Sequence, residues 1–317
     1  MPSLTYRLRR ANLNRIESIL ALALIFGVIA SMTDVLIGDR GLNTVYMGTV
    51  VDIFLRGMYL SLYITTASFA LGLGIGFLVG WIRTTRTVPF KRLLRDFRLT
   101  SADASSHASS QYLLFGLSIV WTGLKYVVRR IMDGYVEIMR GTPLFVQIFF
   151  VWSIFIVFLT RMPERDLLAV LLAMTINTGG YQGEIFRGGL QTVHSGQVEA
   201  ARALGLSRWR AMRYVVLPQT LRLITPPLTN EYIGLLKASA LAFYFGVQEL
   251  TYYAKQEAFS GHVFEAFILT SALYLIVTFT LAKVITMIER RYRIPGLGIQ
   301  QAPAAGKLSR KETAASG

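Results

Sequence analysis

Long apolar runs alternate with short basic segments along the chain. Six stretches are apolar and almost free of charge: 16–37, 57–82, 141–160, 167–183, 223–245 and 266–282. A helix needs about 20 mostly apolar residues to cross the hydrocarbon core of a bilayer. The pattern therefore predicts an all-α membrane protein with about six transmembrane helices. The first stretch is longer than the apolar part of a signal peptide and precedes only a weak cleavage site, which favours an uncleaved anchor.

A seventh charge-free run, 108–124, contains several Ser and Thr residues, and its placement decides the orientation of everything after it. With six spans, one face of the membrane receives 26 of the 33 Lys and Arg residues, in 1–15, 83–140, 184–222 and 289–317. Basic loops stay in the cytoplasm, and a seventh span would place the basic 184–222 segment outside. The pattern favours a helix over 108–128 that lies at the interface or is partly re-entrant, with both chain ends in the cytoplasm.

Composition supports the membrane class and excludes several others. The 317 residues are 53% hydrophobic and only 16% charged, whereas soluble domains carry about 25% charged residues. The net charge of +15 follows from the cytoplasmic loops and suits anionic membrane lipid rather than nucleic acid. The chain has no cysteine and three well-separated histidines, so we expect no disulfide, no metal site and no catalytic site.

Glycines at three positions of the second stretch, four residues apart, predict close helix packing. Gly72, Gly76 and Gly80 fall on one side of a helix and form a smooth ridge. A nucleotide-binding loop is the alternative, but its GxGxxG pattern requires a preceding strand.

The loop 193–220 is unlike a passive connector. Ser195 can cap a helix that begins near Gln197, and Gly205 can end it. Ser207 can cap a second helix, which we expect to stop near Pro218. Small alanines on the first helix would permit insertion into a groove of another protein, while the four arginines of the loop would equally suit lipid headgroups. Periodicity alone does not separate these two readings.

Several motifs in a fixed order resemble one family. The loop motif consists of Glu199, Ala200, Ala201, Gly205, Leu217 and Pro218. The segment 135–144 reads YVEIMRGTPL, the segment 230–237 reads NEYIGLLK, and 289–292 reads ERRY. Together they resemble the permease subunits of ABC importers for polar amino acids. Val215 replaces the usual Ile, the segment 99–128 looks inserted, and Ala238-Ser239 follows Lys237 where an acidic residue and Thr-Ser are common.

The resemblance implies a type I ABC permease fold over 53–296, preceded by an N-terminal segment, span and loop over 1–52 and followed by a disordered tail over 297–317. It implies that Glu199 to Gly205 form a coupling helix that docks on an ATPase dimer. ATP would bind there, since the chain lacks a GxxxxGK[ST] loop. The other implied partners are a second or related permease subunit and a periplasmic binding protein that delivers a polar amino acid in the bacterial inner membrane. This chain would then hold no cofactor and be no enzyme.

Polar side chains inside the expected spans are candidates for the translocation pathway. Glu231 and Lys237 lie in the fifth stretch, where a lone charge costs about 2.5–3.5 kcal/mol. Asn177 and Tyr181 lie in the fourth. These groups would contact the ammonium and carboxylate of an amino acid, or alternatively pair helices with one another. Glu184 and Arg187, at the cytoplasmic end of the fourth stretch, suit a gate or a loop contact.

Two other functions stay open. The permease could serve another small solute, such as an opine or a methionine-like compound. From a different class, an ion-coupled secondary transporter could use Glu231 and Asp34, but the chain shows no convincing inverted repeat and the loop motif would remain unexplained.

Overall fold

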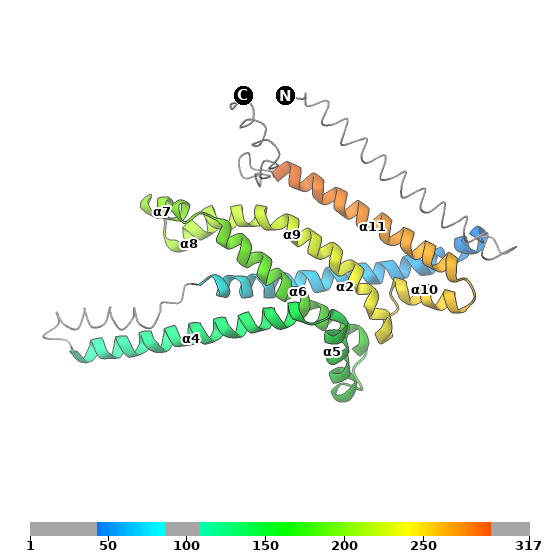
Figure 1. The fold of residues 1–317 in the computed structure, drawn as a ribbon, viewed down its shortest axis with the longest axis horizontal. Helices are drawn as coiled ribbons and strands as arrows, with labels where there is room; N and C mark the ends of the chain where they lie inside the picture. Colours follow the sequence, from blue (N-terminus) through cyan, green and yellow to red (C-terminus); the bar gives the residue numbers. More distant parts are fainter. Residues whose placement is uncertain (1–42, 86–107, 293–317) are drawn as a thin grey trace, which may run out of the picture.

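The computed structural model describes residues 43–85 and 108–292, and every regular element in these ranges is a helix (Figure 1). The expected first span, Asp34, the tail 297–317 and the first part of the expected insertion lie outside the described residues. The elements are α2 (Thr44–Thr84), α4 (Ala108–Gly141), α5 (Leu144–Phe158), α6 (Arg165–Thr192), α7 (Ser195–Ala203), α8 (Arg208–Ala211), η1 (Met212–Val216), α9 (Leu217–Ala238), η2 (Ser239–Phe245), α10 (Leu250–Phe259) and α11 (Val263–Tyr292).

The centre of the fold is the contact between α2 and α6, which run in the same direction. A Cβ added to Gly72 would lie 2.5 Å from Thr178 Cγ2, and one added to Gly76 would lie 2.6 Å from Gln182 Cβ. At Gly80 the corresponding distance, to Phe186 Cβ, is 2.6 Å. These separations are too short for any side chain, so the predicted glycine ridge is confirmed as a packing surface.

A sharp break separates α4 from α5. α4 is one continuous helix of 34 residues, and α5 leaves it at an angle of 109° after Thr142 and Pro143. Pro143 has an extended backbone, and proline cannot donate the N–H that would continue the helix. The expected third span, 141–160, is therefore realised as a 15-residue helix, shorter than a bilayer requires. The segment 108–128 is helical over its described residues, but it is the first part of α4 and extends past the end of α2, which α4 meets at Arg129 and Asp133 (Figure 1).

Length and apolar character single out a few of the described helices as membrane spans. α2 and the 263–285 part of α11 each satisfy both conditions, and α4 from Gly116 together with α5 satisfies them as a bent pair. α6 and α9 contain the fourth and most of the fifth expected stretches. Both helices contain polar residues, which form the hydrogen bonds and ion pairs described below.

The loop 193–220 folds into helices whose ends differ in part from those expected. Ser195 is the first residue of α7 rather than its cap, since His194 occupies the cap position. The second helix does not stop at Pro218. It passes through a π-helical turn, η1, into α9, where Pro218 is the second residue. The Leu217 N–H donates to the carbonyl of Met212, five residues back, so the π-helical turn lies directly before the position where Pro218 lacks an N–H.

Apolar side chains form two clusters around α2. One joins α2 to α5, α6, α9 and η2 through buried residues that include Ile64, Ile148 and Met174. The other joins the first half of α2 to α10 and α11 through Phe54 and Leu250. α2 is thus the element that both halves of the described chain share.

Candidate functional site

The helices α7 and α8 form a surface at one end of the molecule, at the upper left of Figure 1. Gly205 ends α7 with φ +85°, and the N–H of Leu206 donates to the carbonyl of Ala201 at 3.1 Å. This is the glycine-terminated helix end that the sequence predicts. The Ser207 hydroxyl accepts a hydrogen bond from the Arg210 N–H at 3.3 Å, so the expected cap of the second helix is confirmed.

One side of α7 rests on the chain and the other is exposed. Ala201 is buried, whereas Glu199 and Ala200 are exposed. Leu204 is 84% exposed and Trp209, on α8, is 66% exposed. Gln219, on α9, donates to the Gln197 side chain at 2.7 Å and ties α7 to α9. The motif residues Leu217 and Pro218 start α9 beside η1. The result is a supported platform with exposed apolar side chains.

Amide side chains satisfy the backbone at the break between α4 and α5. The Gln147 amide donates to the carbonyls of Met139 and Thr142 at 3.1 and 3.2 Å. Asn177, from α6, donates to the Gln147 side chain at 2.9 Å and to the Met139 carbonyl at 3.3 Å. The last carbonyls of a helix have no partner within the helix and are satisfied by such side chains. The candidate pathway residue Asn177 is thus engaged in holding the break, and sequence reasoning missed Gln147.

The other candidate pathway residues lie in different places. Glu231, on α9, accepts a hydrogen bond from Thr178 of α6 at 3.1 Å. Tyr181 lies under the guanidinium of Arg140, 5.8 Å from the ring centre. Lys237 is exposed near the end of α9, and within the described ranges it forms no ion pair with Glu231. The contacts of Asn177 and Glu231 are interhelical, so the pairing that the sequence left open is present at both.

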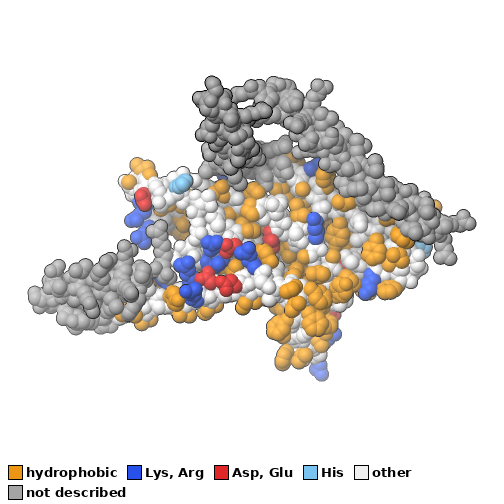
Figure 2. Space-filling view, in the orientation of Figure 1, with side chains coloured by type: hydrophobic (Ala, Val, Ile, Leu, Met, Phe, Trp, Pro, Cys, Tyr) orange, Lys and Arg blue, Asp and Glu red, His pale blue; other side chains and the backbone are white. Residues whose placement is uncertain are grey.

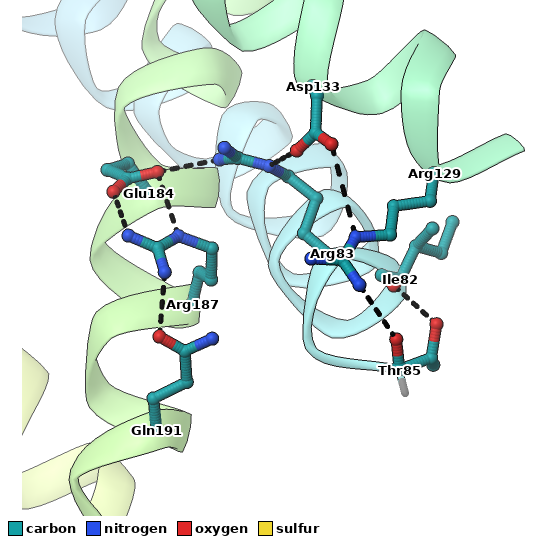
Figure 3. A network of polar contacts seen from close by, with 8 residues as sticks. All are labelled: Ile82, Arg83, Thr85, Arg129, Asp133, Glu184, Arg187 and Gln191. Atoms are coloured by element: carbon teal, nitrogen blue, oxygen red, sulfur yellow. Dashed lines mark hydrogen bonds and ion pairs between the residues drawn. The ribbon is translucent and has the colours of Figure 1, made fainter. Parts of the chain in front are cut away.

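Four charged side chains join α2, α4 and α6 (Figure 3). Arg83 Nε lies 2.6 Å from Asp133 Oδ1, and Arg83 Nη1 lies 2.6 Å from Glu184 Oε2. Arg187 also pairs with Glu184, and its Nη1 donates to the Gln191 side chain at 2.7 Å. We call Arg83, Asp133, Glu184 and Arg187 the ionic network. Figure 2 shows Lys, Arg, Asp and Glu side chains gathered together on one part of this face of the molecule.

The ionic network is partly shielded from solvent, and its charges stabilise one another. The Arg83 side chain is 12% exposed, and those of Asp133 and Glu184 are each 25% exposed. Hydrogen bonds from Arg187, and then from Arg83, lower the pKa of Glu184 to about 2, against the opposing effect of burial. Glu184 is therefore ionised throughout the range of cellular pH. A signal for this contact was available, because Arg83 and Glu184 each follow a charge-free run directly and have opposite charge.

A second polar contact ties α10 to α2 and α11. Glu249 is fully buried and caps α10, accepting from the Tyr252 N–H at 3.0 Å. The Ser61 hydroxyl of α2 donates to its other oxygen at 3.1 Å, and Tyr274 of α11 lies 3.5 Å away. Burial raises the pKa of Glu249 to about 7. Sequence reasoning missed this residue, since a Glu in a loop between two spans looks solvent-exposed.

Comparison with known proteins identifies the family. Residues 113–294 match the family described as the inner membrane component of binding-protein-dependent transport systems, and that range includes α5 to α11 and most of the ionic network. The chain belongs to this family. Members of the binding-protein-dependent permease family are membrane components of ABC transporters, and membership decides against the ion-coupled secondary transporter.

Individual relatives show which members of the family the chain is similar to. The chain is 36% identical over 185 residues to the glutamine transport system permease protein GlnP of Escherichia coli, covering 57% of this permease and 83% of GlnP. It is 32% identical over 221 residues to the nopaline transport system permease protein NocM of Agrobacterium fabrum, covering 67% and 86%. A crystal structure of an amino-acid ABC transporter with histidines has a TM-score of 0.60 and 28% identity, covering 80% of this chain and all of that one.

Proposed function

We propose that this permease forms the translocation pathway of an ATP-driven importer for a polar amino acid, delivered by a periplasmic binding protein. The observation that carries the proposal is the 36% identity that extends over 83% of the glutamine permease GlnP. The RGTPL segment supports it independently, because it lies at the break between α4 and α5 and is held there by Gln147 and Asn177.

The platform formed by α7 and α8 is where a separate ATPase dimer would bind. Glu199 and Ala200 are exposed on α7, Ala201 faces the chain, and Gly205 turns the backbone toward α8. Leu217 and Pro218 begin α9 directly after η1. Exposed Leu204 and Trp209 would then be covered by the walls of a groove on the ATPase. ATP is bound and hydrolysed on that partner, and this chain holds no cofactor.

Movement of the platform would reach the membrane through α6. Only Val193 and His194 separate α6 from α7, and the ionic network and the glycine contact join α6 to α4 and α2. ATP-driven closure of the ATPase dimer would displace α7 and bias the permease between outward- and inward-facing states, provided that docking differs in free energy between these states.

The remaining features of the importer follow from the same assignment. The permease acts as a pair, with a second copy or a related subunit, crosses the bilayer about six times and keeps both chain ends in the cytoplasm. Its pathway is lined by Asn177, Tyr181, Glu231 and Lys237. The exposed aromatic residues of α5 face lipid or the paired subunit. Hydrophobic side chains cover the projecting arm of Figure 2, where α5 lies.

Reconstitution tests the proposal. The permease would be placed in liposomes with candidate ATPase and binding-protein partners, and radiolabelled amino acids would be supplied with the binding protein. We expect uptake that requires ATP and is abolished by a hydrolysis-deficient ATPase. Uptake driven by an ion gradient without the ATPase would overturn the proposal.

A specific observation favours an opine as the alternative substrate. The chain covers 86% of the nopaline permease NocM at 32% identity, and opines carry an amino-acid end like that of glutamine. Offering nopaline and glutamine in the same liposomes separates the two, since only the correct solute stimulates ATP hydrolysis through its binding protein.

A further inference from the structure

A row of apolar side chains with seven-residue spacing is left exposed on α4. Leu117, Leu124, Ile131 and Ile138 are 61%, 52%, 58% and 58% exposed. Val120 and Val127, three residues after the first two, are 68% and 52% exposed. We call these six residues the α4 seam. Exposed large side chains in so regular a row are unlike the scattered apolar residues of an ordinary protein surface.

The opposite side of α4 is the one that packs on the rest of the chain. Val136 is 2% exposed, and Asp133 contacts Arg83 of α2. Tyr135 donates a hydrogen bond to the carbonyl of Ile176 in α6. The α4 seam is therefore directed away from the chain's own helices, and a partner for it has to come from outside the described residues.

The spacing of the α4 seam indicates what kind of partner fits. Apolar residues at the first and fourth positions of a seven-residue repeat are typical of helices that wind around a second helix. A single straight helix drifts by about 20° over seven residues, so only a supercoiled neighbour keeps such a row covered. Lipid tails do not require a seven-residue spacing of the apolar side chains that they cover. α4 is also long enough, because 34 residues extend for roughly 50 Å.

Glycines on α4 have no packing role within the part of the chain that the structure describes. A Cβ added to Gly116, Gly123 or Gly134 would meet no atom within 4 Å. Each glycine inside a helix costs roughly 0.5–1 kcal/mol relative to alanine. Gly134 continues the α4 seam at the position after Ile131 that corresponds to Val120 and Val127, and Gly116 and Gly123 lie directly beside it. Small residues at these places let the backbone of a second helix approach closely.

We propose that the α4 seam is the contact between two copies of this permease, with the two α4 helices parallel and in register. The inference rests on the proposed pairing of permease subunits and names its surface. Two copies inserted in the same direction are related by a two-fold axis along the membrane normal. The axis of α4 lies roughly along that of the apolar helix α2 in Figure 1, and the first part of α4 extends past the end of α2. The two-fold axis therefore makes the paired α4 helices parallel and brings each seam residue opposite its own copy.

The area that pairing would bury and the charges beside the α4 seam are both consistent with a second copy of the permease as the partner. Covering the α4 seam on both copies would bury on the order of 1,000 Å², about the smallest area found in specific interfaces. All six residues of the α4 seam are apolar, and the charged residues of α4 lie at other positions of the helix. The flanking Arg130 and Glu137 have opposite charge, and in a parallel pair each lies on the far side of the interface from its own copy, so that like charges do not face one another.

Disulfide crosslinking tests the proposal, because the chain has no cysteine of its own. Single variants Leu124→Cys and Ile131→Cys would be oxidised in membrane vesicles that also contain the ATPase. The matched control is Tyr126→Cys, since Tyr126 is 50% exposed on the same helix but outside the α4 seam. We expect both seam variants to shift to a disulfide-linked dimer and the control to remain a monomer.

Two further measurements separate the possible failures. Mixing Leu117→Cys with Ile138→Cys chains would give a mixed dimer only if the helices were antiparallel, which would overturn the proposal. The mass of the purified complex with ATPase reports pairing itself. Two permease copies per complex without crosslinks at the seam would refute the seam and leave the proposed function standing. A lone permease that binds no ATPase would refute the proposed function.

Discussion

Arg83 Nη1 lies 2.6 Å from Glu184 Oε2, and this contact fixes the end of α2 against α6. The same guanidinium reaches Asp133 of α4. One arginine thus joins three helices, and a planar fork with several donors is suited to two carboxylates in a way that a lysine ammonium is not.

Replacing either partner should weaken the fold and the transmission of movement. We expect Arg83→Gln and Glu184→Gln each to lower the free energy of unfolding by about 1.5–3 kcal/mol, the range for hydrogen bonds to charged groups. The double variant should lose less than the sum, because the two changes remove one shared contact. Thermal unfolding in detergent measures the stability, and the ratio of solute transported to ATP hydrolysed measures coupling.

The control for the ionic network is Arg165→Gln. Arg165 lies 3.6 Å from Asp166 in a more exposed pair, and such pairs contribute about 0–1 kcal/mol. Equal losses for Arg165→Gln and Arg83→Gln would contradict a special role for the network.

Two glycines on the same helix should respond in opposite ways to alanine. A Cβ at Gly76 would lie 2.6 Å from Gln182 Cβ and 3.0 Å from the backbone nitrogen of Gly183, so Gly76→Ala must separate α2 from α6, at a cost of about 1–3 kcal/mol. Gly74 has open space around it, and Gly74→Ala should be neutral or stabilise by about 0.5–1 kcal/mol. Thermal unfolding of both variants decides, and a stable Gly76→Ala protein would contradict the described contact.

Stability should depend on pH through Glu249. The carboxyl has a pKa of about 7 in the folded chain and an ordinary value of 4.5, so its contribution is complete below pH 4.5 and is lost as pH rises through 7. The melting temperature should therefore fall between pH 4.5 and 7 and level off above. Glu249→Gln should remove that part of the dependence, whereas Glu164→Gln, at an exposed position, should leave it. An unchanged pH profile in Glu249→Gln would show that another group is responsible.

Charge reversal on the platform should detach the ATPase. Glu199→Arg places a cation on the exposed side of α7, and Gly205→Glu puts a side chain at φ +85°, a conformation that costs roughly 1–2 kcal/mol outside glycine. We expect both variants to insert normally, to lose co-purification with the ATPase and to lose uptake. Glu164→Arg makes the same charge change in the loop before α6 and should retain both. Uptake that survives in Glu199→Arg and Gly205→Glu would contradict the docking assignment.

Sequence reasoning succeeded where a local pattern determines the structure. The glycine spacing on α2 predicts the close contact with α6, and Gly205 and Ser207 end and begin helices as their chemistry requires. It was wrong at Pro218, because a proline at the second position of a helix looks the same in sequence as one that follows a helix. The expected cap at Ser195 was wrong for a similar reason, since any residue that carries a hydroxyl group near the start of a helix is a candidate cap.

Contacts between helices were harder to predict from the sequence than helix ends. Arg83 and Glu184 are 101 residues apart, and their meeting depends on the register between α2 and α6, which the glycine ridge sets. The break before α5 was missed because the run 141–160 is apolar throughout, so that hydropathy continues across Pro143 without interruption. The sequence also did not show that the candidate pathway residues lie apart. Neighbours on α6 such as Asn177 and Thr178 face different helices, and this depends on how the helices pack.

The contact of α2 with α6 reduces the number of parts that can move independently. Backbones this close leave no room to slide or rotate, since each glycine admits only the side chain already opposite it. Because Arg83 joins them, α2, α6 and the adjoining part of α4 form a single stiff unit, to which α7 is attached by two residues. A push on the platform is then converted into a tilt of the whole block rather than into a bend within it.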